Sequence, residues 1–99
     1  MGEVVFVFGP ARRVSVSDED ARYLLNSWFR FRGGGLAGLK LTGATRAALE
    51  TGAEIHLTEA MRKDLLEVLD KVEEDGRLGT GRLPELRDEA RSPIELPPD

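Results

Sequence analysis

The chain has 99 residues, of which 40% are hydrophobic and 32% are charged, and its formal net charge is −4 at pH 7. A chain of this length forms one domain with one modest core, and no apolar run in it approaches the roughly 20 residues that a membrane span requires. The absence of cysteine excludes disulfides and thiolate sites, and together with a single histidine it excludes ordinary zinc sites.

Two strands joined by a short turn are predicted near the N-terminus. Residues 3–9, EVVFVFG, are dense in β-branched and aromatic side chains and end at a Gly-Pro pair. Residues 12–17, RRVSVS, alternate between valines and polar residues, which is typical of a strand with one buried face. The short connection indicates a hairpin, although a proline turn can also direct the second strand elsewhere.

A helix is predicted from Asp18 to about Phe31, with Ser17 as its N-cap. Three acidic residues lie in its first turn, where negative charge interacts favourably with the helix dipole. Apolar residues recur at helical spacing and form the stripe expected to be buried: Ala21, Leu24, Leu25, Trp28 and Phe31. Three consecutive glycines, residues 33–35, then end the helix.

Residues 36–51 allow two interpretations. The run GLKLTG alternates and is bounded by glycines, which is typical of a strand. The run ATRAALET is helix-like and is followed by Gly52, a favourable residue just after a helix. We favour one helix that packs tightly through a face of small residues. Gly38 and Gly43 would each cost this helix about 1 kcal/mol relative to alanine.

A third strand is predicted over residues 53–58, AEIHLT. Its alternation places Ile55 and Leu57 toward the interior and Glu54 and His56 toward solvent. Any Ser-His-Asp arrangement would have to use this one histidine, which the pattern places on the outward face. We therefore interpret it as a surface histidine.

The second half of the chain predicts a long helix and a short one. Thr58 caps a helix over residues 59–75, and a shorter helix over 83–91 has Pro84 in its first turn. The buried stripe of the long helix is predicted to comprise Met61, Leu65, Leu66, Val68, Leu69 and Val72. The Pro-rich tail, residues 92–99, is expected to be frayed or docked on a neighbour.

These elements predict a small α+β domain over residues 1–91. Its sheet has two or three strands, partly antiparallel, with an N-terminal hairpin, and it packs against two long amphipathic helices and one or two shorter ones. Residues 13–28 and 54–69 align at an offset of 41, each as a strand that leads into a capped helix with a Leu-Leu pair. The alignment suggests a strand–helix–helix pseudo-repeat, although any strand that ends in Ser or Thr before an amphipathic helix looks similar.

Two motif matches fail in their context. GGGLAG, residues 33–38, fits the dinucleotide pattern GxGxxG, but the preceding segment carries arginines and continues a helical stripe instead of a buried strand. Residues 71–82 resemble a calcium loop, but Lys71 and Arg82 occupy the first and last ligand positions. We therefore expect no catalytic constellation, no cofactor and no metal, and hence a non-enzymatic role.

The apolar surplus of the chain predicts a protein–protein interface. The run VVFVF is apolar on both faces, so the first strand needs cover on both sides. A homodimer is the simplest source of that cover, and a different protein partner is also compatible. The candidate interface residues are Val5, Phe6, Val7, Phe8, Trp28, Phe29 and Phe31. Trp28 and Phe31 also fit an ordinary core, so both interpretations of the aromatic cluster stay open.

The alternative function is binding of nucleic acid or another anionic ligand. Its candidate residues are Arg12, Arg13, Arg30 and Arg32, which would contact phosphates while neighbouring aromatics stack on bases. The charge distribution argues against it. Residues 1–52 carry seven basic and five acidic side chains, and residues 53–99 carry seven basic and thirteen acidic ones, whereas nucleic-acid binders are usually basic.

The remaining composition bears on location and source. No basic region precedes the first apolar run, so we expect no signal peptide and a cytoplasmic location. Arginine far exceeds lysine, glutamine is absent and asparagine occurs once, which fits a thermophile or a GC-rich bacterial genome. The sequence thus predicts a cytoplasmic, homodimeric interaction module with no membrane association.

Overall fold

β1 (Glu3–Gly9) is the central strand of a three-stranded mixed sheet in the computed structural model, which describes residues 3–31, 35–76 and 81–94. β1 pairs antiparallel with β2 (Arg12–Ser17) and parallel with β3 (Ile55–His56). The predicted hairpin is therefore confirmed. The third strand is also present, but its regular part is two residues long, shorter than the predicted run.

The strand pairing determines which face of the sheet each residue occupies. Val4 lies opposite Val16 and Phe6 lies opposite Val14, so the alternation of β2 continues across β1. On the other edge Phe6 lies opposite Ile55. Because paired residues point to the same side of a sheet, one face collects the buried paired residues Val4, Phe6, Val14, Val16 and Ile55. Phe8 and Leu57, which continue the alternation of β1 and β3, are buried as well.

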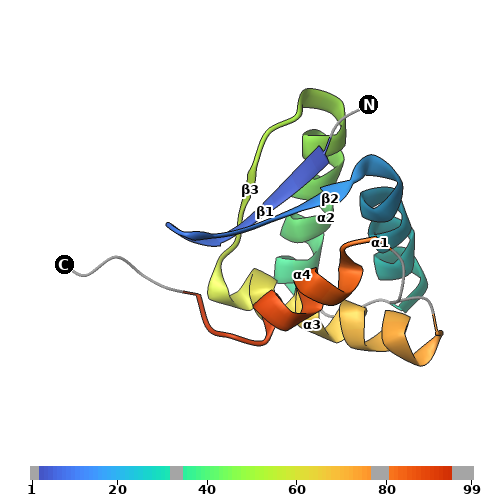
Figure 1. Cartoon of the computed structure of the whole chain (residues 1–99). Coiled ribbons are helices and arrows are strands. Elements are labelled where there is room, and N and C mark those ends of the chain that lie inside the picture. The colour runs from blue at the N-terminus through green and yellow to red at the C-terminus, as the bar shows by residue number, and fades with distance from the viewer. Residues whose placement is uncertain (1–2, 32–34, 77–80, 95–99) are drawn as a thin grey trace.

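Four helices in the described residues pack on that face: α1 (Asp18–Phe31), α2 (Gly35–Thr51), α3 (Glu59–Glu74) and α4 (Leu83–Ala90). Figure 1 shows α2 behind the strands, α1 to the right of them and α3 below them. The small α+β fold is thus confirmed, with α1 within its predicted bounds and α3 one residue shorter than predicted. The side chains of Phe29, Phe31 and residues 35–38 lie outside the described part of the chain.

Both predicted N-caps are confirmed. The backbone N–H of Asp20 donates to Ser17 Oγ over 3.2 Å, and that of Met61 donates to Thr58 Oγ1 over 3.2 Å. Each bond satisfies a donor that the first helical turn leaves without a partner. The caps fix where α1 and α3 begin, and so fix which helix residues face the sheet.

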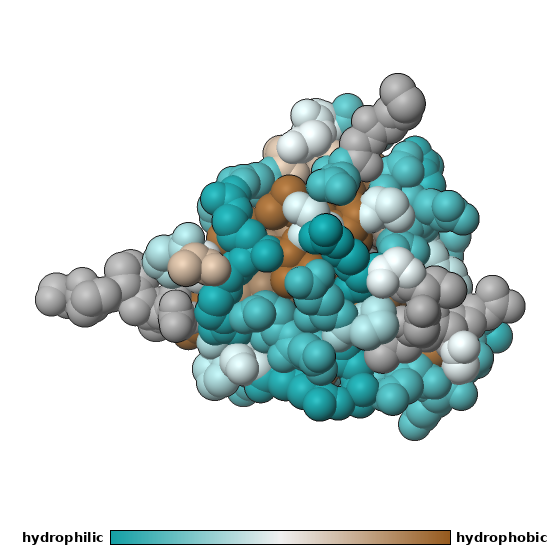
Figure 2. All heavy atoms as spheres, in the orientation of Figure 1, coloured by the Kyte–Doolittle hydropathy of each residue, from teal (hydrophilic) through white to brown (hydrophobic). Residues whose placement is uncertain are grey.

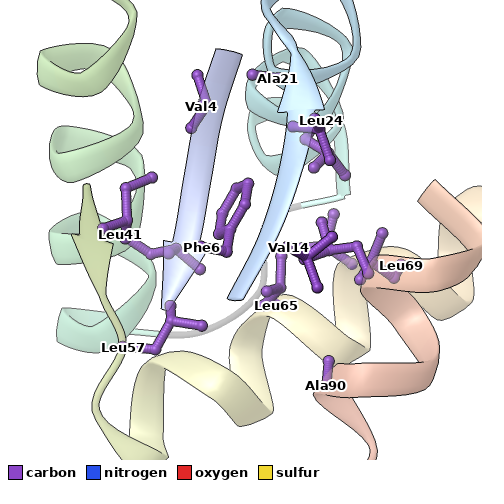
Figure 3. Close-up of a cluster of buried hydrophobic side chains, with 14 of the residues drawn as sticks. Val4, Phe6, Val14, Ala21, Leu24, Leu41, Leu57, Leu65, Leu69 and Ala90 are labelled. Carbon is purple, nitrogen blue, oxygen red and sulfur yellow. The ribbon is translucent and has the colours of Figure 1, made fainter. Parts of the chain in front are cut away.

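The helices and the sheet share one core, shown in part in Figure 3. Leu24, Leu41, Leu65 and Leu69 extend toward the space beside Phe6 and Val14 from three different helices. The buried apolar helix residues are Ala21, Leu24, Trp28, Leu41, Ala48, Met61, Leu65, Val68, Leu69, Val72, Leu83, Leu86 and Ala90. The predicted stripe members Leu25 and Leu66 are only half-buried, at its margin.

α2 is one continuous helix, as favoured from the sequence. Its buried side includes Leu41, Thr45 and Ala48, and the Thr45 hydroxyl donates to the Leu41 carbonyl over 2.8 Å. Gly52, at φ 75°, follows the helix and donates to the Ala48 carbonyl over 2.8 Å. The expectation that small residues form the packed face is wrong for Gly43, which is exposed and has nothing within 4 Å of the position a Cβ would occupy.

After β1, the element order is strand, helix, helix in both halves of the chain. β2 and β3 flank the same central strand from opposite sides, so each half supplies one edge of the sheet. This order matches the predicted pseudo-repeat. None of the helices in the described ranges combines the length and apolar character that crossing a membrane requires.

Candidate interaction surface

The face of the sheet that points away from the helices has an apolar centre. Val5 and Val7 of β1 alternate with the buried residues and are half-buried. Their neighbours on β2 are Ser15 and Arg13, and His56 lies opposite Val7 on β3. Figure 2 shows apolar residues, ringed by polar ones, in the region where Figure 1 places the strands. We call this surface the outer sheet face.

Charged side chains of both signs surround the two valines. Arg13, on β2, forms an ion pair with Glu54, which precedes β3, and this pair therefore crosses the central strand. His56 Nε2 lies 3.6 Å from Glu54 Oε1, and the His56 side chain is 72% exposed. The outer sheet face is thus a small apolar centre with a positive side and a negative side.

The aromatic residues predicted for the interface lie in the core instead. Phe6, Phe8 and Trp28 expose 0%, 1% and 4% of their surface, respectively, because the helices of the same chain cover them. The prediction that they form an interface therefore needs correction. Of the predicted set, Val5 and Val7 keep exposed surface, and the side chains of Phe29 and Phe31 lie outside the described residues.

Trp28 has a partner that was not predicted from the sequence. Its indole N–H donates to Asp64 Oδ2 of α3 over 2.7 Å, and both side chains are buried. Burial raises the pKa of Asp64 above its usual value; the bond from Trp28 opposes that shift, and nearby Glu67 adds to it. An acidic residue within the apolar stripe of α3 is the sequence signal that could have revealed this contact.

The raised pKa of Asp64 leads to a pH-dependent prediction. Between the usual Asp pKa and the raised folded value, the folded state binds more protons than the unfolded state, so stability falls as pH rises. Asp64→Asn keeps an oxygen acceptor for Trp28 without the charge, and should raise the free energy of unfolding by about 1 kcal/mol at pH 7. Urea denaturation from acidic to neutral pH should show this gain growing with pH. A gain that is constant with pH would contradict the assignment.

Arg12, predicted to contact an anionic ligand, is instead bound to the C-terminal segment. Its guanidinium pairs with the Glu89 carboxylate and donates to the backbone carbonyls of Glu89, Ser92 and Pro93, at 3.0 Å for Glu89 and 3.1 Å for Ser92. It also lies 5.7 Å from the centre of the Phe8 ring. The first residues of the predicted tail are therefore docked on β2.

A second arginine holds the same segment. Arg62 of α3 is 7% exposed and donates to the Ala90 carbonyl over 2.6 Å. Its guanidinium also binds Glu59, which lowers the pKa of that carboxyl. Glu59 in turn accepts a bond from the Ile94 N–H over 3.4 Å. Arg12 and Arg62 thus fix the end of α4 and the residues after it, a role that the sequence pattern did not reveal.

The other predicted arginine contacts also have acidic partners. Arg13 binds Glu54, and Arg30 Nη1 lies 3.2 Å from Asp75 Oδ2 near the end of α3. Arg32 lies outside the described residues. The three described arginines therefore bind three separate parts of the chain, and the structure does not gather them into one basic patch.

One cleft of about 270 Å³ lies where the end of α2 meets the beginnings of β1 and α1. Its lining is acidic at three positions and comprises Glu3, Val4, Asp18, Ala48, Leu49, Glu50, Thr51 and Gly52. Within the described residues, no group of three or more His, Asp or Glu side chains is placed to hold a metal ion.

In comparisons with known proteins, no family model, no curated protein and no solved structure matches this chain. Function is therefore inferred from the chain's own surface. Among the surfaces predicted from the sequence, the outer sheet face keeps its two valines adjacent and partly exposed.

Proposed function

We propose that this chain is a non-enzymatic protein–protein interaction module of the cytoplasm, and that it works as a homodimer formed through the outer sheet face. The observation that supports the proposal is the position of Val5 and Val7, which are partly exposed at the centre of the sheet while the helices pack on the other side. An antiparallel or mixed sheet with one apolar face left open gains stability when a second layer covers it.

The charges on the outer sheet face favour a second copy as the covering layer. Arg13 and Glu54 lie on opposite sides of β1. If two copies stack face to face around a twofold axis along β1, Arg13 of one copy lies over Glu54 of the other, and the valines meet between them. The same surface is then complementary to itself, as a twofold interface requires.

The test is a mass measurement on variants of this face. Sedimentation equilibrium at micromolar concentration should show self-association of the wild type, and Val5→Lys/Val7→Lys should lower the mass by removing one twofold contact. Ala60→Lys, on the exposed side of α3, adds the same type of charge elsewhere and should change nothing. A wild type that stays monomeric, or a valine variant with unchanged mass, would overturn the proposal.

A further inference from the structure

A second exposed surface lies on the outer side of α2. Leu39 is 71% exposed, and no other large hydrophobic residue among those described is as open to solvent. Single exposed apolar residues are common on protein surfaces and need no explanation by themselves. Leu39 is of interest because small exposed residues lie beside it on the same face of α2.

Gly43 and Ala47 continue the line from Leu39 at intervals of four residues, and both are exposed. Residues four apart lie on the same face of a helix. A glycine within a helix is unfavourable relative to alanine, yet nothing lies within 4 Å of the position that a Cβ would occupy at Gly43. The chain's own packing therefore does not require a glycine here, whereas close approach of another backbone would.

Two oppositely charged residues beside this line lie at equal distances from Thr45. Lys40 and Glu50 are exposed, and neither has an ion-pair partner within the described residues. They lie five residues before and five residues after Thr45, so in two antiparallel copies of α2 that cross at that level each lysine meets the other copy's glutamate. In the same alignment Gly43 lies opposite Ala47, and two small residues permit close contact between the helices.

We propose that the outer side of α2 is a second self-association surface, on which two copies of this chain pack their α2 helices antiparallel with the crossing near Thr45. Leu39 of each copy would then be covered by the end of the other helix, near Thr51. A second copy is preferred over another protein's helix because Lys40 and Glu50 of this one helix become complementary when the helix is reversed, while exposed Arg46 then lies opposite Ala44. The proposal does not rest on the outer sheet face.

Charge reversal tests the antiparallel alignment directly. Lys40→Glu and Glu50→Lys should each weaken the association about tenfold, because each puts two like-charged pairs into a twofold contact. The double variant Lys40→Glu/Glu50→Lys restores opposite charges and should recover the wild-type affinity. Lys63→Glu on α3 is the matched control and should have no effect. Failure of the double variant to recover would overturn this alignment.

Leu39→Glu separates this surface from the outer sheet face. With both contacts present, sedimentation equilibrium should give a tetramer, or larger species, for the wild type, a smaller assembly for Leu39→Glu or Val5→Lys/Val7→Lys, and a monomer for their combination.

If Leu39→Glu and the charge reversals leave the mass unchanged while the valine variant lowers it, the α2 proposal is overturned and the proposed dimer stands. The opposite result would overturn the proposed dimer alone. Because Leu39, Lys40 and Glu50 are exposed, circular dichroism should show the α2 variants folded.

Discussion

Trp28→Ala should lower the free energy of unfolding by about 3–5 kcal/mol, the usual cost of truncating a buried aromatic side chain. Trp28 is 4% exposed, and its indole N–H donates to buried Asp64 over 2.7 Å. The substitution therefore leaves a cavity between α1 and α3 and removes the donor from a buried carboxylate. Urea denaturation at pH 7 measures the loss.

Trp28→Phe separates the two parts of that loss. Phenylalanine fills much of the volume but cannot donate to Asp64, so this variant should lose less than Trp28→Ala. In a double-mutant cycle, the loss from Trp28→Phe should shrink when Asp64 is already replaced by Asn, because a neutral acceptor depends less on the donor. Equal losses in the two backgrounds would contradict an energetic link between Trp28 and Asp64.

Arg12→Ala is expected to lower the free energy of unfolding by about 2–3 kcal/mol, because hydrogen bonds from charged donors are stronger than neutral ones. One side chain contacts the Glu89 carboxylate and three backbone carbonyls, and it is mostly buried at 15% exposure. Hydrogen exchange should also show earlier opening of α4, since the residues after that helix lose their anchor.

Arg30→Ala is the matched control for Arg12→Ala. Arg30 also has an acidic partner, Asp75, but its side chain is 66% exposed. Exposed ion pairs contribute about 0–1 kcal/mol. Similar losses for the two alanine variants would show that the contacts of Arg12 with the C-terminal segment add nothing to stability.

The sequence predicted most local structure, because helix caps and hydrophobic periodicity are local signals. The inner and outer faces of β1 were harder to distinguish, since VVFVF is apolar at every position. The hairpin contained the missing information. Val14 and Val16 of β2 define a buried face, and pairing with Phe6 and Val4 extends that face across β1. Applying the register to the alternation of β2 would have placed Phe6 in the core and Val7 outside.

The outcome for the predicted site residues Arg12 and Trp28 was less predictable, because their partners lie far away in the sequence. Arg12 and Glu89 are 77 positions apart, and Trp28 and Asp64 are 36 apart. No periodicity or spacing rule connects such pairs, so the arginines of the first half looked free to bind a ligand. The exposed row of Leu39, Gly43 and Ala47 on α2 could not be predicted for another reason. A helix with several glycines shows weak amphipathic patterning, and only the packing shows which side faces solvent.

β1 pairs with one strand that is close to it in the sequence, β2, and with one that is distant, β3, so the two pairings should form at different stages of folding. The turn to β2 closes within a few residues, so the hairpin can form on the microsecond timescale of isolated hairpins. The pairing of Phe6 with Ile55 instead closes a loop that contains both α1 and α2, and the chain must lose the conformational entropy of closing that loop before the contact can stabilise it. The sheet is therefore expected to assemble from the hairpin outward, with the short parallel edge joining last.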